Sequence, residues 1–247
     1  MGADGGLSGE RIVAGEVPQA VMAPAWSPTD GKLHFLTDTS GWWNLYREDS
    51  PGSVAALCPM EGAEFGGPAW GLGGSPYAFL PDGRILCVYG GPAVEGGSQL
   101  ALLDTIETPG KLSAVPMPPH SSLGDVSVST GPGGEGVMVA MVAGSSSEPS
   151  EVRAALLPAD TSAPWEWRSF RASSDVSIEP GYLAAPQQME FPTSNRGESR
   201  TAHLIFYPPT NQDYSGGADG ELPPLLVKSH GGPTSSASSA FSLNIRE

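Results

Sequence analysis

The residues best suited to chemistry lie near the end of the chain, in the run PLLVKSHGGPT at 224–234. An apolar run that ends in His-Gly-Gly-Pro predicts a strand leading into a tight loop with an exposed backbone. When a nucleophile attacks an amide carbonyl, negative charge develops on the oxygen, and fixed backbone N–H donors contribute on the order of 3–4 kcal/mol. Gly231 and Gly232 are therefore candidates for an oxyanion-hole loop, because neither carries a Cβ. Pro233 would fix the turn, and His230 would shape the loop rather than act as a base.

The alternative for this loop is an ordinary Gly-Gly-Pro turn with no catalytic part. A serine nucleophile needs a Gly-x-Ser-x-Gly elbow, in a fold whose triad runs in the order Ser, Asp, His. No serine of the chain stands in that pattern, and the nearest sequence, GLGGSPY at 71–77, precedes the loop. We therefore expect no catalytic nucleophile, acid or base in this chain, a triad beyond Glu247, and a fragment of a longer protein.

The rest of the chain consists mostly of short strand patterns separated by turns. Its 33 Gly and 25 Pro in 247 residues disfavour long helices. Three stretches join a turn to an alternating strand and are each followed by two more strand-like runs; they begin at Ser27, Leu80 and Thr130, 53 and 50 residues apart. The sequence Pro-Ala-Trp precedes the first two, at 24–26 and 68–70. Four short strands thus recur in each unit.

A four-strand unit with this period is typical of a β-propeller blade. The predicted fold is mainly β: a partial propeller of about three four-stranded blades at 13–67, 68–120 and 121–172, a linker at 173–189, and the first strands of a truncated α/β-hydrolase domain at 190–247. The last part rests on a hairpin around TSNRGES and on the strand before the His-Gly-Gly loop. A β-sandwich with accidental periodicity is the alternative.

Composition excludes several classes of partner. The net charge is -15 with no basic run, which disfavours nucleic acid and anionic membranes as partners. The longest apolar stretch, VMVAMVA at 137–143, is a buried strand too short to cross a bilayer. The N-terminus has no secretory signal pattern, and Cys58 and Cys87 fit reduced, buried positions, so we expect a cytoplasmic or organellar protein that is not secreted.

No metal site and no cofactor are predicted. His34 and His203 alternate with apolar residues in strands, and His120 has no carboxylate or histidine at ligand spacing. The run GPGGEG at 131–136 lacks the Lys-Ser/Thr of a phosphate loop, so it is expected to be a turn between strands.

Four segments carry a family resemblance. SPTDGKLHFLTDTSGWWNLYR (27–47), YAFLPDGRILCVY (77–89), EFPTSNRGESRTAHLIFYPPTN (190–211) and PPLLVKSHGGPTSSASSAFSLNIRE (223–247) resemble the prolyl oligopeptidase family of serine peptidases, in its dipeptidyl aminopeptidase and acylaminoacyl-peptidase branch. The resemblance implies a propeller that caps an α/β-hydrolase domain, a Ser-Asp-His triad at their interface, and cleavage of short peptides near their N-termini.

Three functions remain open at this point. The first is a fragment of a serine exopeptidase, inactive by itself, whose full-length form takes short or N-acylated peptides. The second is a non-enzymatic propeller module that binds peptides or proteins. The third is an esterase or lipase, although those commonly carry a third Gly where Pro233 stands and lack a propeller. The choice between acyl-amino acids and dipeptides, and the oligomeric state, stay open.

Overall fold

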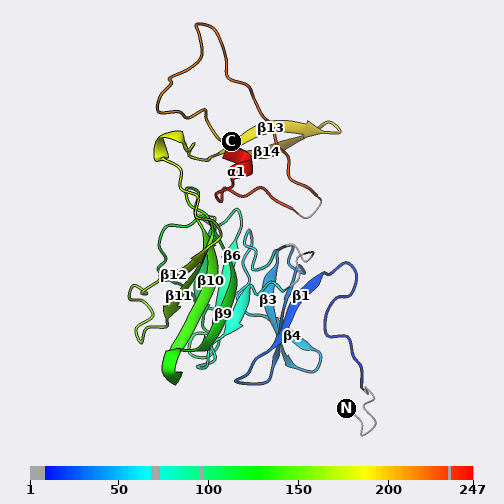
Figure 1. The fold of residues 1–247 in the computed structure, drawn as a ribbon. Coiled ribbons are helices and arrows are strands. Elements are labelled where there is room, and N and C mark those ends of the chain that lie inside the picture. The colour runs from blue at the N-terminus through cyan, green and yellow to red at the C-terminus, as the bar shows by residue number, and fades with distance from the viewer. Residues whose placement is uncertain (1–8, 68–69, 71–72, 95–96, 233–234, 247) are drawn as a thin grey trace, which may run out of the picture.

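The computed structural model describes residues 9–67, 70, 73–94, 97–232 and 235–246 (Figure 1). The described residues between Val21 and Ala172 form three four-stranded antiparallel sheets, each with its strands in chain order. Sheet 1 contains β1 (Val21–Trp26), β2 (Leu33–Thr37), β3 (Asn44–Ser50) and β4 (Ser53–Ala56). Sheet 2 contains β5 (Tyr77–Phe79), β6 (Ile85–Gly90), β7 (Ser98–Leu103) and β8 (Leu112–Ala114). Sheet 3 contains β9 (Ser122–Thr130), β10 (Val137–Gly144), β11 (Glu151–Leu156) and β12 (Arg168–Ala172).

Three successive four-stranded meanders with almost no helix are consistent with propeller blades and with the predicted repeat. One strand lies elsewhere than expected. The first Pro-Ala-Trp is part of β1, but the first strand of sheet 2 is β5, downstream of the second Pro-Ala-Trp. Of that second motif, Trp70 lies in a turn, and Pro68 and Ala69 lie outside the described residues. A three-residue strand is too short for alternation to reveal, so the repeated motif was misleading there.

The core lies between the sheets, and β6 shows why. Its side chains alternate between two apolar clusters: Ile85, Cys87 and Tyr89 join the cluster shared with sheet 1, whereas Leu86 and Val88 join the cluster shared with sheet 3. A strand covered on both faces reads as a continuous apolar run, as ILCVY does. Sheet 2 is therefore held between its two neighbours.

Both cysteines lie in the cluster between sheets 1 and 2. Cys58 and Cys87 are free and buried, as predicted. Burial raises the pKa of the Cys58 thiol to about 12 and raises the pKa of Cys87 well above its usual value. Both are thus protonated, apolar packing groups at neutral pH.

Polar contacts also join sheet 1 to sheet 2. The Tyr77 hydroxyl, on β5, lies 2.7 Å from the carbonyl oxygen of Ala23 and 3.1 Å from that of His34. The His34 ring meets the ring of Phe79 edge to face, with centroids 4.9 Å apart. The Nδ1 atom of His34 lies 3.2 Å from the carbonyl oxygen of Lys32, so Nδ1 carries the proton of the neutral ring. His34 is thus a buried histidine whose Nδ1 is hydrogen-bonded to the main chain.

Stability is expected to fall in acid because of His34. Burial lowers its pKa, against the raising effects of the Lys32 carbonyl and the Asp30 carboxylate. The unfolded chain, with a histidine pKa of about 6.5, therefore binds the proton first. The contribution of His34 to the free energy of unfolding is complete above about pH 6.5. It is lost as the pH falls below this value, by at most about 1.4 kcal/mol per pH unit.

Urea unfolding at pH 7.5 and 5.5 measures this effect as the difference between wild type and His34→Gln. The variant should lose less stability on acidification than wild type does. His203→Gln is the matched control, since the His203 side chain is 71% exposed on the C-terminal hairpin. Equal acid losses in wild type and His34→Gln would contradict the prediction.

After Ala172 the chain leaves the sheets and forms a separate hairpin. A short 3-10 turn, η2 (Pro180–Tyr182), precedes β13 (Gln187–Asn195) and β14 (Glu198–Phe206), which pair only with each other. Arg196 and Gly197 connect them with φ of 51° and 85°, the left-handed pair that a two-residue hairpin turn requires. The predicted hairpin is confirmed, and it lies at the top of the view beside the C-terminus (Figure 1).

The predicted hydrolase strands beyond this hairpin are wrong for the described residues. Between Phe206 and the short helix α1 (Leu243–Arg246), no strand is present among the described residues. The three apolar side chains of this run are exposed, at 81% for Leu225, 83% for Leu226 and 80% for Val227. A strand needs a partner for its N–H and C=O groups, and no sheet among the described residues is placed to pair with this run.

The apolar run and the glycine-rich run of sheet 3 lie where the sequence predicts a strand and a turn. The run at 137–143 is β10, whose Val139 and Met141 are buried. The GPGGEG run contains the 3-10 turn η1 (Pro132–Gly134) between β9 and β10. No helix among the described residues is long and apolar enough to cross a membrane.

Candidate functional site

The predicted oxyanion-hole loop is exposed in this chain. His230, Gly231 and Gly232 are all exposed, and Pro233 lies outside the described residues. A Cβ added at Gly231 or Gly232 would meet no heavy atom within 4 Å. The Nδ1 of His230 lies 2.6 Å from the Gly231 carbonyl oxygen, so His230 holds the local backbone.

The two glycines offer backbone N–H groups to whatever approaches them. Neither N–H has a hydrogen-bond partner among the residues that the structure describes. An oxyanion hole requires such open donors, directed at the oxygen on which charge develops. In the described part of the chain both donors therefore remain open.

The C-terminal segment contacts sheet 3 at one end of its strands. The Phe241 N–H donates to the Ser145 carbonyl oxygen, 2.8 Å away, in the connection between β10 and β11. The same connection forms one wall of a cleft of about 600 Å³, and the segment 172–186 forms the other wall. The cleft is lined in part by the acidic side chains of Glu148, Glu151 and Asp175. This size is within the range of small-molecule sites.

The histidines provide no metal site. No group of three or more His, Cys, Asp or Glu side chains that could hold a metal ion is present among the described residues. Both ring nitrogens of His120 lie 2.9 Å from main-chain carbonyl oxygens, those of Pro118 and Ser98. The Nδ1 of His203 lies 3.2 Å from Glu190 across the hairpin. Each of these side chains has a local structural contact.

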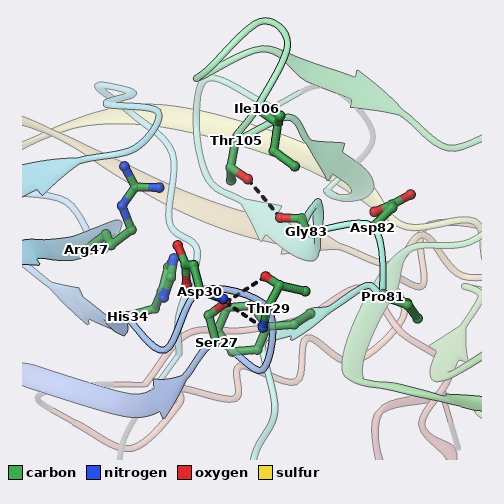
Figure 2. A pocket seen from close by; sticks show the side chains of 11 residues that line it. Ser27, Thr29, Asp30, His34, Arg47, Pro81, Asp82, Gly83, Thr105 and Ile106 are labelled. Atoms are coloured by element: carbon green, nitrogen blue, oxygen red, sulfur yellow. Dashed lines mark hydrogen bonds between the residues drawn. The ribbon is translucent and has the colours of Figure 1, made fainter.

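Sequence reasoning missed one polar cluster, which the fold builds from the turn between β1 and β2. Ser27, Asp30 and His34 lie together at one pocket (Figure 2). These are the residue types of a hydrolytic triad, but Ser27 is not a nucleophile here. Its Oγ lies 3.0 Å from the Thr29 hydroxyl and accepts from the N–H groups of Thr29 and Asp30, both at 3.4 Å. Ser27 therefore caps a turn.

Known structures provide the comparison that decides what this arrangement belongs to. A crystal structure of puromycin hydrolase matches with a TM-score of 0.77 and 32% identity, over 99% of this chain and 34% of that one. The chain is similar to puromycin hydrolase. A second structure, of its S511A mutant complexed with PGG, matches with a TM-score of 0.75 and 32% identity over 96% of this chain and 32% of that one. A puromycin-hydrolyzing peptidase of Mycobacterium tuberculosis matches with a TM-score of 0.74 and 30% identity, over 94% of this chain and 32% of that one.

The similarity covers nearly all of this chain but only a part of each relative. The chain spans about one third of the length of the solved structures that it matches. No protein-family model matches the chain. A comparison with curated proteins also found no match. The chain thus resembles a peptidase over a part the size of a propeller region.

Proposed function

We propose that this chain is part of a serine peptidase of the prolyl oligopeptidase family, comprising propeller blades and the beginning of the catalytic domain. The observation that carries the proposal is the 32% identity to puromycin hydrolase over 99% of the chain, with a TM-score of 0.77. At this identity the likeness extends beyond fold to sequence. Puromycin, short peptides and N-acylated peptides are the proposed substrates.

The outer face of sheet 3 supports the proposal that more blades complete the propeller. On sheet 3, Val142 and Val152 face each other across β10 and β11 and are 37% and 40% exposed. Leu156 is 50% exposed on the same strand as Val152. A row of this kind on a closed propeller would be covered by the next blade.

The proposed division of labour follows from which groups the chain carries. Gly231 and Gly232 would supply oxyanion donors, and the triad would come from the catalytic domain beyond this chain. The sheets would restrict access, so that short substrates enter and folded proteins do not. No metal or cofactor is needed for such acyl transfer. The cytosol or an organelle is the proposed compartment.

Hydrolysis of puromycin by the complete polypeptide tests the proposal, with dipeptidyl and N-acylaminoacyl fluorogenic amides as parallel substrates. Saturable hydrolysis is expected, and a sulfonyl fluoride that sulfonylates active serines should abolish it. The 247-residue chain alone is the matched control and should release no product. A folded complete polypeptide that hydrolyses none of the three substrates would refute the peptidase and favour a binding module.

A further inference from the structure

A pocket between sheets 1 and 2 has no part in the proposed peptidase chemistry. It lies at the turns that join β1 to β2, β5 to β6 and β7 to β8 (Figure 2). In an antiparallel meander these turns lie at the opposite end from the connection of the second and third strands, which is the kind that Phe241 contacts in sheet 3. The pocket measures about 250 Å³. It is formed only because two sheets pack, so its residues come from separate sequence segments.

One side of the pocket carries hydrogen-bond acceptors. The Asp30 carboxylate accepts from the Lys32 N–H at 3.1 Å. Partial burial opposes ionisation of Asp30, but hydrogen bonds from Ser27 and the Lys32 N–H outweigh it and lower the pKa, so Asp30 is charged at neutral pH. His34 uses Nδ1 on the Lys32 carbonyl, which leaves Nε2 as an acceptor with no partner among the described residues. A carboxylate, a ring nitrogen and a hydroxyl pair are suited to an ammonium group.

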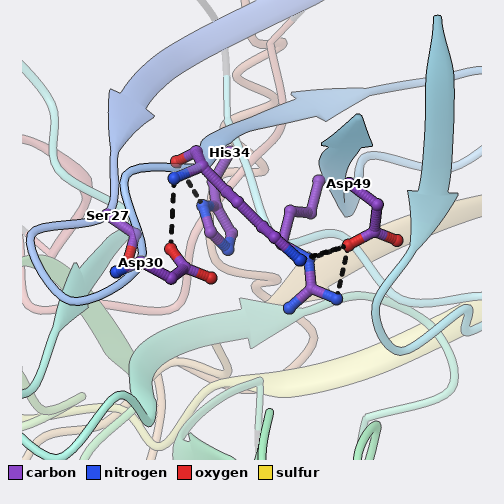
Figure 3. A network of polar contacts seen from close by, with 6 residues as sticks. Ser27, Asp30, His34 and Asp49 are labelled. Carbon is purple, nitrogen blue, oxygen red and sulfur yellow. Dashed lines mark hydrogen bonds and ion pairs between the residues drawn. The ribbon is translucent and has the colours of Figure 1, made fainter. Parts of the chain in front are cut away.

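The other side carries a guanidinium group. Arg47 donates from Nε and Nη2 to one oxygen of Asp49, both at 2.7 Å. Lys32 reaches that same oxygen with its Nζ at 3.0 Å (Figure 3). The Nη1 of Arg47 has no hydrogen-bond partner among the residues that the structure describes. Arg47 is therefore held in place by Asp49 while one end of its planar group remains available to a carboxylate.

The third wall is mostly apolar, and the Asp82 carboxylate that also lines it is paired with Arg84 at 2.7 Å. Phe79, Pro81 and Ile106 line the pocket, and Gly83 closes it below Thr105, whose hydroxyl donates to the Gly83 carbonyl at 2.8 Å. The volume equals the share of about eight water molecules at about 30 Å³ each, which is below the roughly 300–1,000 Å³ of drug-sized sites. A nucleotide is too large, and the net charge of -15 disfavours an anionic ligand.

We propose that this pocket binds a free α-amino acid with an apolar side chain, such as leucine. Asp30, His34 Nε2 and the Ser27–Thr29 hydroxyls take the ammonium group, Arg47 Nη1 takes the carboxylate, and Phe79 and Ile106 contact the side chain. A zwitterion satisfies both charged walls and adds no net charge to an acidic protein. The site is independent of the peptidase active site and of the proposed function.

Isothermal titration of the complete polypeptide with L-leucine tests the site without using activity. Saturable binding with a Kd of about 1 mM or tighter is expected. Leucinamide, which lacks the carboxylate, and N-acetylleucine, which lacks the ammonium group, should each bind at least about tenfold more weakly. Equal binding of leucine, leucinamide and N-acetylleucine, or no saturable heat with leucine, would overturn the proposal. The pocket would then be a surface depression filled by water.

Variants identify the pocket as the place of binding. Asp30→Asn keeps an oxygen for the Lys32 N–H but removes the charge, and should weaken leucine binding at least about tenfold. Arg47→Gln should have a similar effect. Glu107→Gln is the control, because it removes one carboxylate at the same end of sheet 2 without lining the pocket. Wild-type affinity in both pocket variants would place leucine elsewhere and refute the assignment.

Discussion

Replacing Gly231 or Gly232 with valine in the complete peptidase is expected to lower kcat on the order of 10²-fold. The proposed reaction develops negative charge on the carbonyl oxygen of the substrate, and the open N–H groups of this loop are its proposed donors. A branched side chain at either glycine would keep that oxygen from reaching the main chain. The effect should appear in kcat, because the charge develops only in the transition state.

The structure makes this a clean test of chemistry against folding. A Cβ at Gly231 or Gly232 meets nothing within 4 Å in this chain, and neither residue has the left-handed backbone that only glycine adopts easily. Gly216, in the polar loop after the hairpin, has the same two properties and is the matched control. Gly216→Val should keep wild-type kcat within about twofold, whereas full activity in both loop variants would remove the oxyanion role.

The three sheets could be predicted from the sequence because their strands carry local patterns. In β10 the buried Val139 and Met141 alternate with partly exposed neighbours, and in β6 an unbroken apolar run reflects cover on both faces. The strand predicted in the apolar run before the His-Gly-Gly loop is absent for a different reason. Apolar residues alone do not make a strand, which also needs a hydrogen-bonded neighbour, and no sheet among the described residues pairs with this run.

The pocket between sheets 1 and 2 was beyond sequence reasoning for a different reason. The sequence placed His34 in a strand but could not indicate its neighbour, because the ring of Phe79 that it touches lies 45 residues away. Arg47 and Asp30 come from different turns and strands of sheet 1, and Ile106 comes from sheet 2's last connection. The packing of the two sheets determines which of these side chains line the same pocket. The alternation of apolar residues along a single strand carries no information about that packing.

One aromatic side chain in the connection between sheets 1 and 2 is buried in the joint between them. Phe65 is 2% exposed, and its ring stacks on that of Tyr89 with centroids 5.1 Å apart. Its N–H donates to the Trp43 carbonyl at 2.7 Å, while the preceding Glu64 exchanges two backbone hydrogen bonds with Gly90, at 2.7 and 3.0 Å. The segment 64–65 thus bridges the start of β3 and the end of β6.

Phe65→Ala is therefore expected to reduce the free energy of unfolding by about 3–5 kcal/mol, because it opens a cavity where the backbone on both sides is fixed. Domains are commonly stable by about 5–15 kcal/mol, so this loss is a large part of the total. Urea unfolding followed by tryptophan fluorescence measures this loss.

Val54→Ala is the control: it removes apolar atoms outside the core, at a site 38% exposed on β4, and should change stability by about 0.5 kcal/mol or less. Phe65→Leu should restore much of the loss, since a smaller cavity remains. A change below about 1 kcal/mol in Phe65→Ala would mean that the two sheets are joined mainly by the β2–β5 contacts of Tyr77 and His34 instead.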